Sequence, residues 1–271
     1  FTTEFVLISD NKYDYIFHSA GPSGPANIRP GYALQQIPSI TERGLNLAHR
    51  TGARFIKFSS SEVYGRADVP LTEDTPCVVT PPWDARSEYQ MGFLASETLC
   101  MNHPHPDVQI LRLFNVVGPR QTAECGAVIP RFCEQALRGK PLTIFGNGQQ
   151  RRAFLDVSDL VSFCLTLMEK WPEKKGIWNV ANPGNETRIR DLAILISEQF
   201  RSPTIMNIRP ELTYTEGSEL TSYYRDGVEK RNISIEKAKS LGWEPKVGLE
   251  EIVKKCLSAM QPSSAVIPAT G

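Results

Sequence analysis

The sequence lacks the features that mark several specialised classes of protein. None of its apolar runs reaches the roughly 20 residues that a helix needs to span a bilayer, and no basic start leads into an apolar signal-peptide core. Its 30 basic residues balance its 30 acidic ones, so charge gives no reason to expect nucleic acid or an anionic membrane as a partner. We therefore expect a cytoplasmic protein with neither kind of partner.

The six cysteines include no Cys-x-x-Cys pair, and the histidines show no metal-ligand spacing. We expect no metal site, and we interpret the cysteines as reduced side chains packed like small hydrophobes. An apolar content of 41% and a charged content of 22% are ordinary for a globular protein. The 271 residues are enough for one large domain or two smaller ones.

Hydrophobic periodicity predicts strands that alternate with helices. The expected strands are residues 13–20, 54–59, 108–114, 142–145, 153–157 and 178–181. The expected helices are residues 32–49, 88–102, 128–138, 157–169, 189–200 and 249–260. This alternation predicts an α/β fold, a Rossmann-like parallel sheet with helices on both faces. Residues 261–271 are rich in small side chains, and we expect a disordered tail there.

The most informative stretch is residues 59–65, Ser-Ser-Ser-Glu-Val-Tyr-Gly. It is typical of a buried strand that ends in a loop of hydroxyls and one carboxylate. Tyr89 follows on the next expected helix, and Phe93 lies four residues further on, so both side chains share one helix face.

Further motifs follow in order along the chain. They are residues 15–20 (YIFHSA), 112–120 (RLFNVVGPR), 139–148 (GKPLTIFGNG), 151–159 (RRAFLDVSD), 179–184 (NVANPG) and 243–246 (WEPK). With the stretch at 59–65 and Tyr89, they make almost the whole chain resemble the extended short-chain dehydrogenase/reductase family. The nearest subgroup resembles UDP-glucuronate decarboxylases, with dTDP-glucose 4,6-dehydratases and 4-epimerases close behind.

The resemblance implies a fold, a cofactor and a substrate class. It implies a Rossmann-like domain of residues 1–118 and 152–181 that binds NAD. It implies a small mixed α/β substrate domain of residues 119–151 and 182–260, with the ligand in the cleft between the two. The expected substrate is a nucleotide-sugar, with UDP as the expected nucleotide. The family's usual dimer interface predicts a homodimer formed by the two helices at 32–49 and 88–102.

The resemblance also assigns roles to single residues. Tyr89 is the expected acid/base, Ser60 the hydroxyl that bonds the same sugar oxygen, and Glu62 a carboxylate acting near the sugar C5. The expected substrate contacts are Arg86, Asn115, Arg152 and Arg231. The expected cofactor contacts are Ala20, Gly21, Ser59 and Tyr89. Ordinary alternatives exist for each, such as a core tyrosine, a turn serine, a solvated carboxylate or a surface arginine.

Two departures from the family pattern stand out. The chain contains no G-x-x-G-x-x-G turn, which in the family holds the dinucleotide pyrophosphate at a helix N-terminus. We expect that the start of the family pattern was lost from this chain or not seen; the alternative is that residues 5–10 take the place of the missing strand. The second departure is Phe93, which stands where the family has a lysine that holds the nicotinamide ribose and favours ionisation of the tyrosine.

Three functional hypotheses therefore stay open at this point. The first is an NAD-dependent epimerase, dehydratase or decarboxylase that acts on a nucleotide-sugar through transient oxidation. The second is a diverged enzyme that keeps the sugar pocket but has weakened or lost redox chemistry. The third is a non-catalytic subunit that binds nucleotide-sugars beside an active relative.

Overall fold

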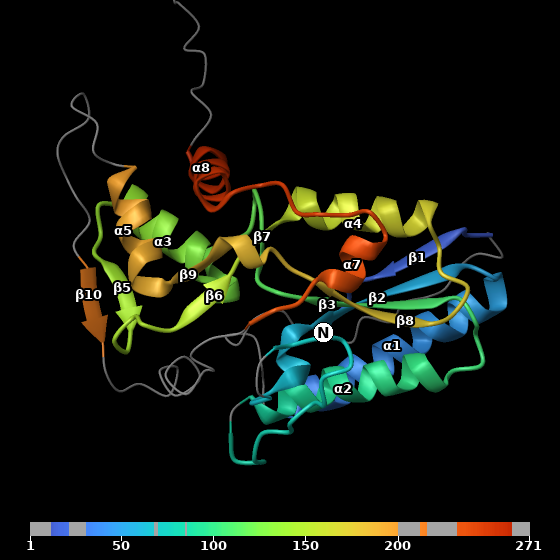
Figure 1. The fold of residues 1–271 in the computed structure, drawn as a ribbon. Helices are drawn as coiled ribbons and strands as arrows, with labels where there is room; N and C mark the ends of the chain where they lie inside the picture. The colour runs from blue at the N-terminus through green and yellow to red at the C-terminus, as the bar shows by residue number, and fades with distance from the viewer. Residues whose placement is uncertain are drawn as a thin grey trace, which may run out of the picture.

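The computed structural model describes residues 12–21, 31–67, 70–84, 86–199, 212–215 and 232–261. Its base is a four-stranded sheet in the order β1-β2-β3-β8 (Figure 1). These strands are β1 (Tyr15–His18), β2 (Arg54–Ser60), β3 (Val108–Leu113) and β8 (Gly176–Val180). All three pairings are parallel, so the carboxyl ends of the strands meet at one edge of the sheet.

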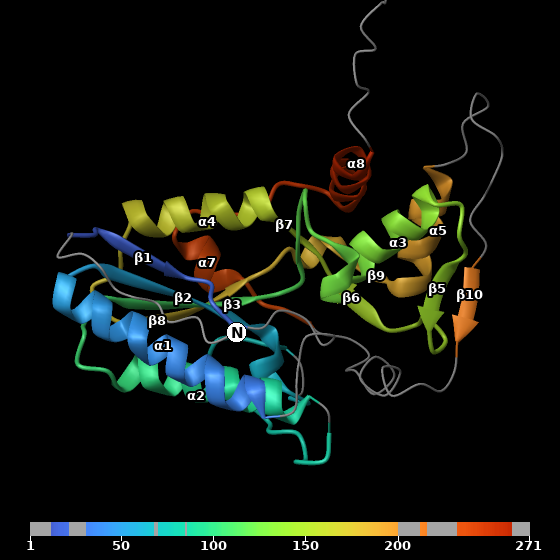
Figure 2. The ribbon, with the colours of Figure 1, turned by 180° about the vertical axis from the view of Figure 1, so that it is seen from behind.

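Helices cover both faces of this sheet, as the alternation of elements predicted. Figures 1 and 2 show α1 (Tyr32–Thr51) and α2 (Ser87–Asn102) on one face, and α4 (Val157–Glu169) with α7 (Glu236–Ser240) on the other. The predicted helices and strands of this region are confirmed to within a few residues at their ends.

A second group of elements lies beyond the carboxyl edge of the sheet (Figure 1). It contains α3 (Val128–Leu137), β5 (Leu142–Phe145), β6 (Arg151–Ala153), β9 (Glu186–Arg188), α5 (Ile189–Glu198), β10 (Leu212–Thr215) and α8 (Leu249–Met260). The helices α3, α5 and α8 and the strand β5 share a hydrophobic cluster of their own, distinct from the clusters around the four-stranded sheet, and Leu212 of β10 packs against it. The division into two domains at the expected boundaries stays a prediction.

The strand expected at 153–157 is instead two short strands. β6 ends at Ala153, and β7 (Leu155–Asp156) pairs with β4 (Val116–Val117) as a separate parallel pair. Between them Phe154 turns into the cavity described below. The Asp156 side chain then accepts the Ser158 N–H at 2.8 Å and so caps the start of α4.

The two helices under the sheet lie unusually close together at one point. A Cβ on Gly92 of α2 would lie 2.6 Å from the backbone oxygen of Ala33 in α1, so only glycine allows this approach. At the same end, the Glu88 carboxylate of α2 accepts the backbone N–H groups of Gly31, Ala33 and Leu34. A carboxylate at these unsatisfied donors stabilises the helix start, and here it also joins α1 to the first turn of α2.

A buried ion pair joins α2 to the sheet. Arg112 on β3 donates to the Glu97 carboxylate of α2, with its shortest bond at 2.8 Å, and both side chains are at most 5% exposed. The Ser59 hydroxyl of β2 donates to the same carboxylate at 2.5 Å. The guanidinium of Arg112 lies 4.6 Å from the centre of the Tyr64 ring. The helix, two strands and the following loop therefore meet at one charged centre.

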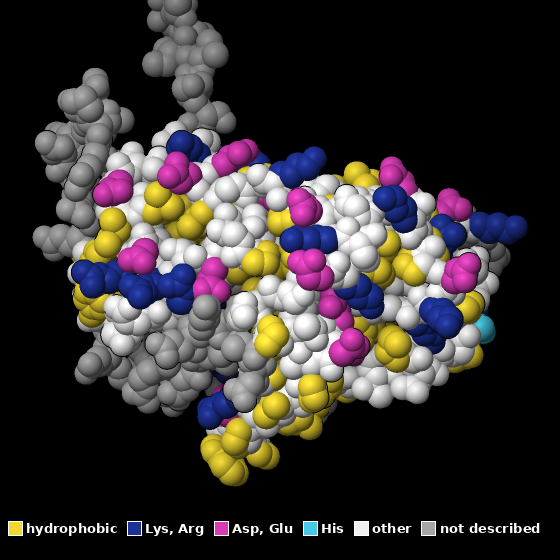
Figure 3. All heavy atoms as spheres, viewed as in Figure 1, with side chains coloured by type: hydrophobic (Ala, Val, Ile, Leu, Met, Phe, Trp, Pro, Cys, Tyr) yellow, Lys and Arg dark blue, Asp and Glu magenta, His cyan; other side chains and the backbone are white. Residues whose placement is uncertain are grey.

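The remaining features of the fold agree with the balanced composition. Acidic and basic side chains are interspersed over the face in Figure 3. In the described part of the chain, no helix combines the length and apolar character that crossing a membrane requires. Five cysteines are placed as free thiols there, and all but Cys77 are buried, as expected of small core side chains.

We expect Arg112→Met to lower the free energy of unfolding by about 3–5 kcal/mol, because it leaves the Glu97 carboxylate buried without its cation. The loss is measured by urea denaturation followed by circular dichroism. Glu97→Gln should cost a similar amount, and the double variant should cost clearly less than the sum of the two. Additive losses would contradict the coupling.

Candidate active site

A cavity of about 470 Å³ lies at the carboxyl edge of the sheet, between the sheet and the second group of elements. Every described residue that the sequence nominated lines this cavity. They are Ala20, Gly21, Ser59, Ser60, Glu62, Arg86, Tyr89, Asn115 and Arg152. Arg231 and most of the turn after Gly21 lie outside the described residues. The convergence is a finding, whereas the individual roles of these residues stay predictions.

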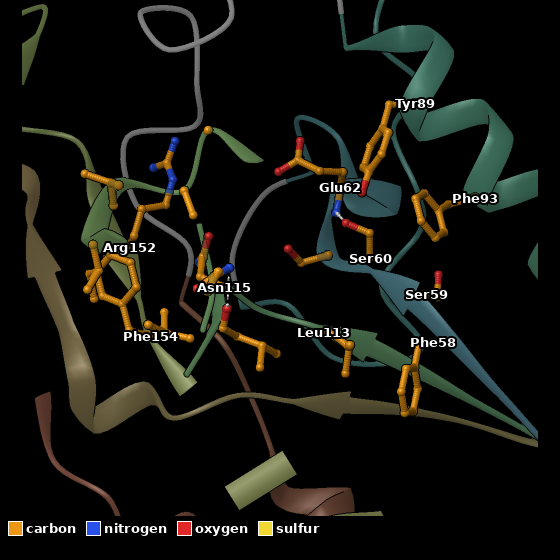
Figure 4. Close-up of a pocket in the computed structure, with 18 of the residues that line it drawn as sticks. Phe58, Ser59, Ser60, Glu62, Tyr89, Phe93, Leu113, Asn115, Arg152 and Phe154 are labelled. Carbon is orange, nitrogen blue, oxygen red and sulfur yellow. Dashed lines mark hydrogen bonds between the residues drawn. The ribbon is translucent and has the colours of Figure 1, made fainter. Parts of the chain in front are cut away.

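The stretch at 59–65 brings hydroxyls and a carboxylate to one end of the cavity. β2 ends at Ser60, whose hydroxyl accepts the Glu62 N–H at 3.2 Å and caps a short 3₁₀ turn (Figure 4). Gly65 ends that turn with φ at 56°, and a Cβ there would lie 1.9 Å from the backbone oxygen of Val78. Only glycine can occupy this position, which is why the loop can turn back beneath α2.

Tyr89 points toward this loop from the first turn of α2 (Figure 4). Burial raises the pKa of Tyr89 well above its ordinary value of 10, and the Glu62 carboxylate raises it further. A hydrogen bond from the Ser60 hydroxyl opposes this rise. The Tyr89 phenol is therefore neutral at pH 7 in this structure, and it becomes a base only when further positive charge is brought near.

Phe93 lies beside Tyr89 on the same helix face, as the spacing predicted. The two rings are in edge-to-face contact with centroids 4.8 Å apart, and Phe93 is 7% exposed. Phe93 also lines the cavity, so this part of the wall is an aromatic ring that carries no charge.

The opposite end of the cavity is polar and cationic. Figure 4 shows Arg152 and Phe154 across the cavity from Tyr89, with Asn115 between the two ends. Asn115 has a positive φ of 39°, a strained value for a residue other than glycine, and its side-chain amide donates to the Ala153 carbonyl at 2.9 Å. This conformation holds Asn115 at the point where β3 passes into the second group of elements.

Sequence reasoning missed a second arginine at this end. Arg131 on α3 lines the cavity, and its guanidinium lies 4.6 Å from the centre of the Phe145 ring, another lining side chain. The helix itself was predicted, but which of its side chains meets the cavity depends on how α3 packs against β5. Of the residues of β5, only Phe145 lines the cavity, while Leu142 and Ile144 are buried in the core.

The geometry therefore combines two chemical capacities. One end offers two hydroxyls and a carboxylate for proton transfer, and the other offers two guanidinium groups and amides for an anionic group.

The model of the NAD dependent epimerase/dehydratase family matches residues 5–181 of this sequence. The chain belongs to this family. Its Rossmann-like fold agrees with that assignment.

Relatives within the family are identical to this chain at more than a third of the aligned residues. UDP-glucuronic acid decarboxylase 4 of Arabidopsis thaliana is 38% identical over 246 residues, which are 89% of this chain and 52% of the relative. UDP-glucuronic acid decarboxylase 1 of Danio rerio is 36% identical over 253 residues, 91% of this chain and 57% of the relative. The chain thus spans about half the length of the curated relatives it matches.

Solved structures show the same fold. MoeE5 in complex with UDP-glucuronic acid and NAD is 25% identical, with a TM-score of 0.74 over 91% of this chain and 78% of that protein. A UDP-galactose 4-epimerase is 26% identical, with a TM-score of 0.70 over 92% of this chain and 77% of that protein. The PbgP3 protein of Burkholderia pseudomallei reaches a TM-score of 0.76 at 21% identity, which shows the fold alone.

Proposed function

We propose that this chain belongs to an NAD-dependent enzyme that modifies a UDP-sugar, with decarboxylation of UDP-glucuronate as the reaction. The observation that carries the proposal is a single cavity with proton-transfer groups at one end and two arginines at the other. A sugar nucleotide has the same polarity, because its reacting sugar is separated from the base by a charged diphosphate. The names of the relatives at 38% and 36% identity favour glucuronate as the sugar.

In this arrangement Arg152 and Arg131 hold the diphosphate, and Phe145 packs against the base. Guanidinium groups suit this task because they stay charged and offer planar pairs of donors to phosphate oxygens. Asn115 lies midway and contacts the sugar or the first phosphate. Arg86, at the start of α2, lines the cavity and would pair with the carboxylate of a glucuronate.

The nicotinamide half of NAD suits the end of the cavity next to β1. Ser19, Ala20 and Gly21 leave room there, since among the described residues a Cβ on Gly21 would come near Ile37 alone, at 3.7 Å. Phe58 and Phe93 supply apolar walls for a flat ring. When bound, NAD would accept a hydride from the sugar and return it.

The residues around that ring would then move a proton. Tyr89 takes the proton of the sugar hydroxyl that is being oxidised, and Ser60 holds the same oxygen by a hydrogen bond. Glu62 lies beside both and acts on the C5 side of the sugar. Because burial raises the pKa of Tyr89, a positive charge at the cavity is needed for this step at neutral pH.

The other two hypotheses are less favoured. Relatives named as decarboxylases argue for an enzyme over a non-catalytic subunit. Phe93 is the observation that keeps weakened redox chemistry as a second candidate. The tests below separate the candidates, since a binding subunit would hold the nucleotide without turning it over.

Tyr89→Phe should reduce release of CO₂ from UDP-glucuronate by about 10²–10⁴-fold, because it removes the proton-transfer group. Turnover is measured with the full-length protein in the presence of NAD. Tyr214→Phe, which alters an exposed tyrosine on β10, is the matched control and should leave the rate unchanged. Full activity in Tyr89→Phe would contradict the role of Tyr89 in proton transfer. Absence of turnover in the unaltered protein would favour a binding role.

Arg152→Ala should weaken UDP binding by about 1.5–3 kcal/mol, the range for a hydrogen bond to a charged group. Isothermal titration calorimetry with UDP gives the affinity. Arg138→Ala removes an exposed arginine on the surface of the second group of elements and should leave the affinity unchanged. Equal affinities of the two variants would remove Arg152 from the diphosphate site.

We also propose that the protein forms a homodimer through α1 and α2. Tyr32 and Leu34 on α1 and Met91 on α2 are each about 41% exposed, so these two helices carry apolar side chains that a second copy would cover. Hydrophobic side chains also gather at the lower edge of Figure 3, over the loop before α2, where Trp83 is 86% exposed.

The cytoplasmic location expected from the sequence stays a prediction.

Leu34→Glu should shift the protein from dimer to monomer, because it places a charge in the proposed apolar interface. Light scattering after size-exclusion chromatography gives the mass. Val161→Glu changes a similarly exposed apolar side chain on α4, on the other face of the sheet, and should leave the mass unchanged. The same mass for both variants would place the interface elsewhere or exclude it.

A further inference from the structure

A fully buried lysine lies behind the wall of the cavity. Lys57, in the middle of β2, has no exposed surface, and no other lysine is buried among the described residues. Taking an ammonium group out of water is costly, so a buried lysine is retained only where its surroundings or its function compensate. Nothing in the site described so far uses it.

The contacts of Lys57 define its charge state. Its ammonium lies 3.3 Å from Nδ1 of His18, while Nε2 of the same ring lies 3.2 Å from the Ile40 carbonyl. The carbonyl can only accept, so Nε2 carries the ring proton and Nδ1 accepts from the ammonium. Burial, with the neighbouring Lys57 charge, lowers the pKa of His18 to about 4, so the histidine is neutral at pH 7. Lys57 therefore keeps its positive charge against a neutral partner.

The ammonium of Lys57 lies near the ring of Phe93, and Phe93 lines the cavity. It lies 5.4 Å from the centre of Phe93, within the range of a cation–π contact. Phe93 lines the cavity and touches Tyr89. One ring therefore separates a buried positive charge from the place where Tyr89 meets its substrate.

We propose that Lys57 is a positioning residue that adds a positive charge to the Tyr89 end of this site from behind Phe93, favouring the neutral, reduced nicotinamide over the cationic, oxidised one. This inference rests on the proposed function. In this arrangement the positive charge comes from Lys57 on β2, because Phe93 on α2 carries none. A site that favours the reduced ring drives oxidation of the sugar, which is the first step that the proposed reaction needs.

Distance supports this effect. A nicotinamide that exchanges hydride with a sugar held by Tyr89 must lie against the Tyr89–Phe93 pair, whose centroids are 4.8 Å apart. The ring would then lie on the order of 10 Å from the Lys57 ammonium, where unit charges in a partly dry site still interact by more than thermal energy. An interaction of this size changes the affinity for NADH relative to NAD by about tenfold.

The charge of Lys57 also predicts a pH dependence. Burial lowers the pKa of Lys57 to about 8, while Cys100 and Glu97 on α2 oppose the shift, and His18 faces it from β1. Because the folded pKa is below the ordinary 10.5, the group is charged below about pH 8 and becomes neutral above it. Preference for the reduced dinucleotide should therefore decline as the pH rises through about 8.

The test compares affinities for the two forms of the cofactor. Dissociation constants for NAD and NADH are measured on the full-length protein by titration calorimetry at pH 7, without substrate. Lys57→Met should lower the ratio of the NAD dissociation constant to the NADH dissociation constant by about tenfold. Lys57→Arg should keep this ratio at pH 7, and the ratio should then stay the same above pH 8. Lys237→Met is the matched control, since it removes a lysine that lies 4.6 Å from the Trp178 ring, outside the cavity.

The outcomes separate this inference from the proposed function. A Lys57→Met variant whose two constants change by the same factor would show a structural role only, and would overturn the inference while leaving the function intact. An unaltered protein that binds neither dinucleotide would overturn both.

A second pair of variants tests the placement of the charge without any ligand. Phe93→Lys should lower the melting temperature, because it brings a second ammonium into contact with Lys57 in a buried site. Adding Lys57→Met should recover much of that loss, since one charge then remains. Equal melting temperatures for the single and double variants would show that the two positions do not share one electrostatic site.

Discussion

The ion pair between Glu97 and Arg112 is the constraint on which the rest of the site depends. It holds α2 against β2 and β3, and the Ser59 hydroxyl shares its carboxylate. Phe93 and Tyr89 lie one and two turns before Glu97 on the same helix, so their distance from the strand ends follows from this ion pair. Taking two charges out of water costs free energy, and only a complete set of partners compensates for that cost. The ion pair is therefore sensitive to loss of either member.

Parallel strands explain why so much of the site follows from the sequence. Ala20, Ser60 and Asn115 each lie at the last residue of a strand or two residues beyond it, and parallel strands end at a common edge. The pairing of Tyr89 with Phe93 follows from helical spacing alone. These are local rules, and they need no knowledge of how distant elements pack.

The residues that sequence reasoning did not find are those that packing selects. Arg131 reaches the cavity because of the angle at which α3 lies on β5, and Phe154 because a strand breaks at that residue. Lys57 lies between Ile56 and Phe58 in a largely buried strand, and its contact with Phe93 joins two elements that are separated in the chain. Periodicity predicts which face of an element is buried, but not which foreign side chain it meets there.

The apolar wall that Phe93 gives to the cavity has a consequence for selective inhibition. A family member with lysine at this position would present an ammonium to a bound ligand, whereas this protein presents a benzene ring. A compound that places a chlorophenyl or cyclopropyl group there would lose affinity for those relatives, because it would desolvate their lysine without replacing its hydrogen bonds. The same group would gain contact area here, so one side chain makes this pocket chemically distinguishable within a family of shared fold.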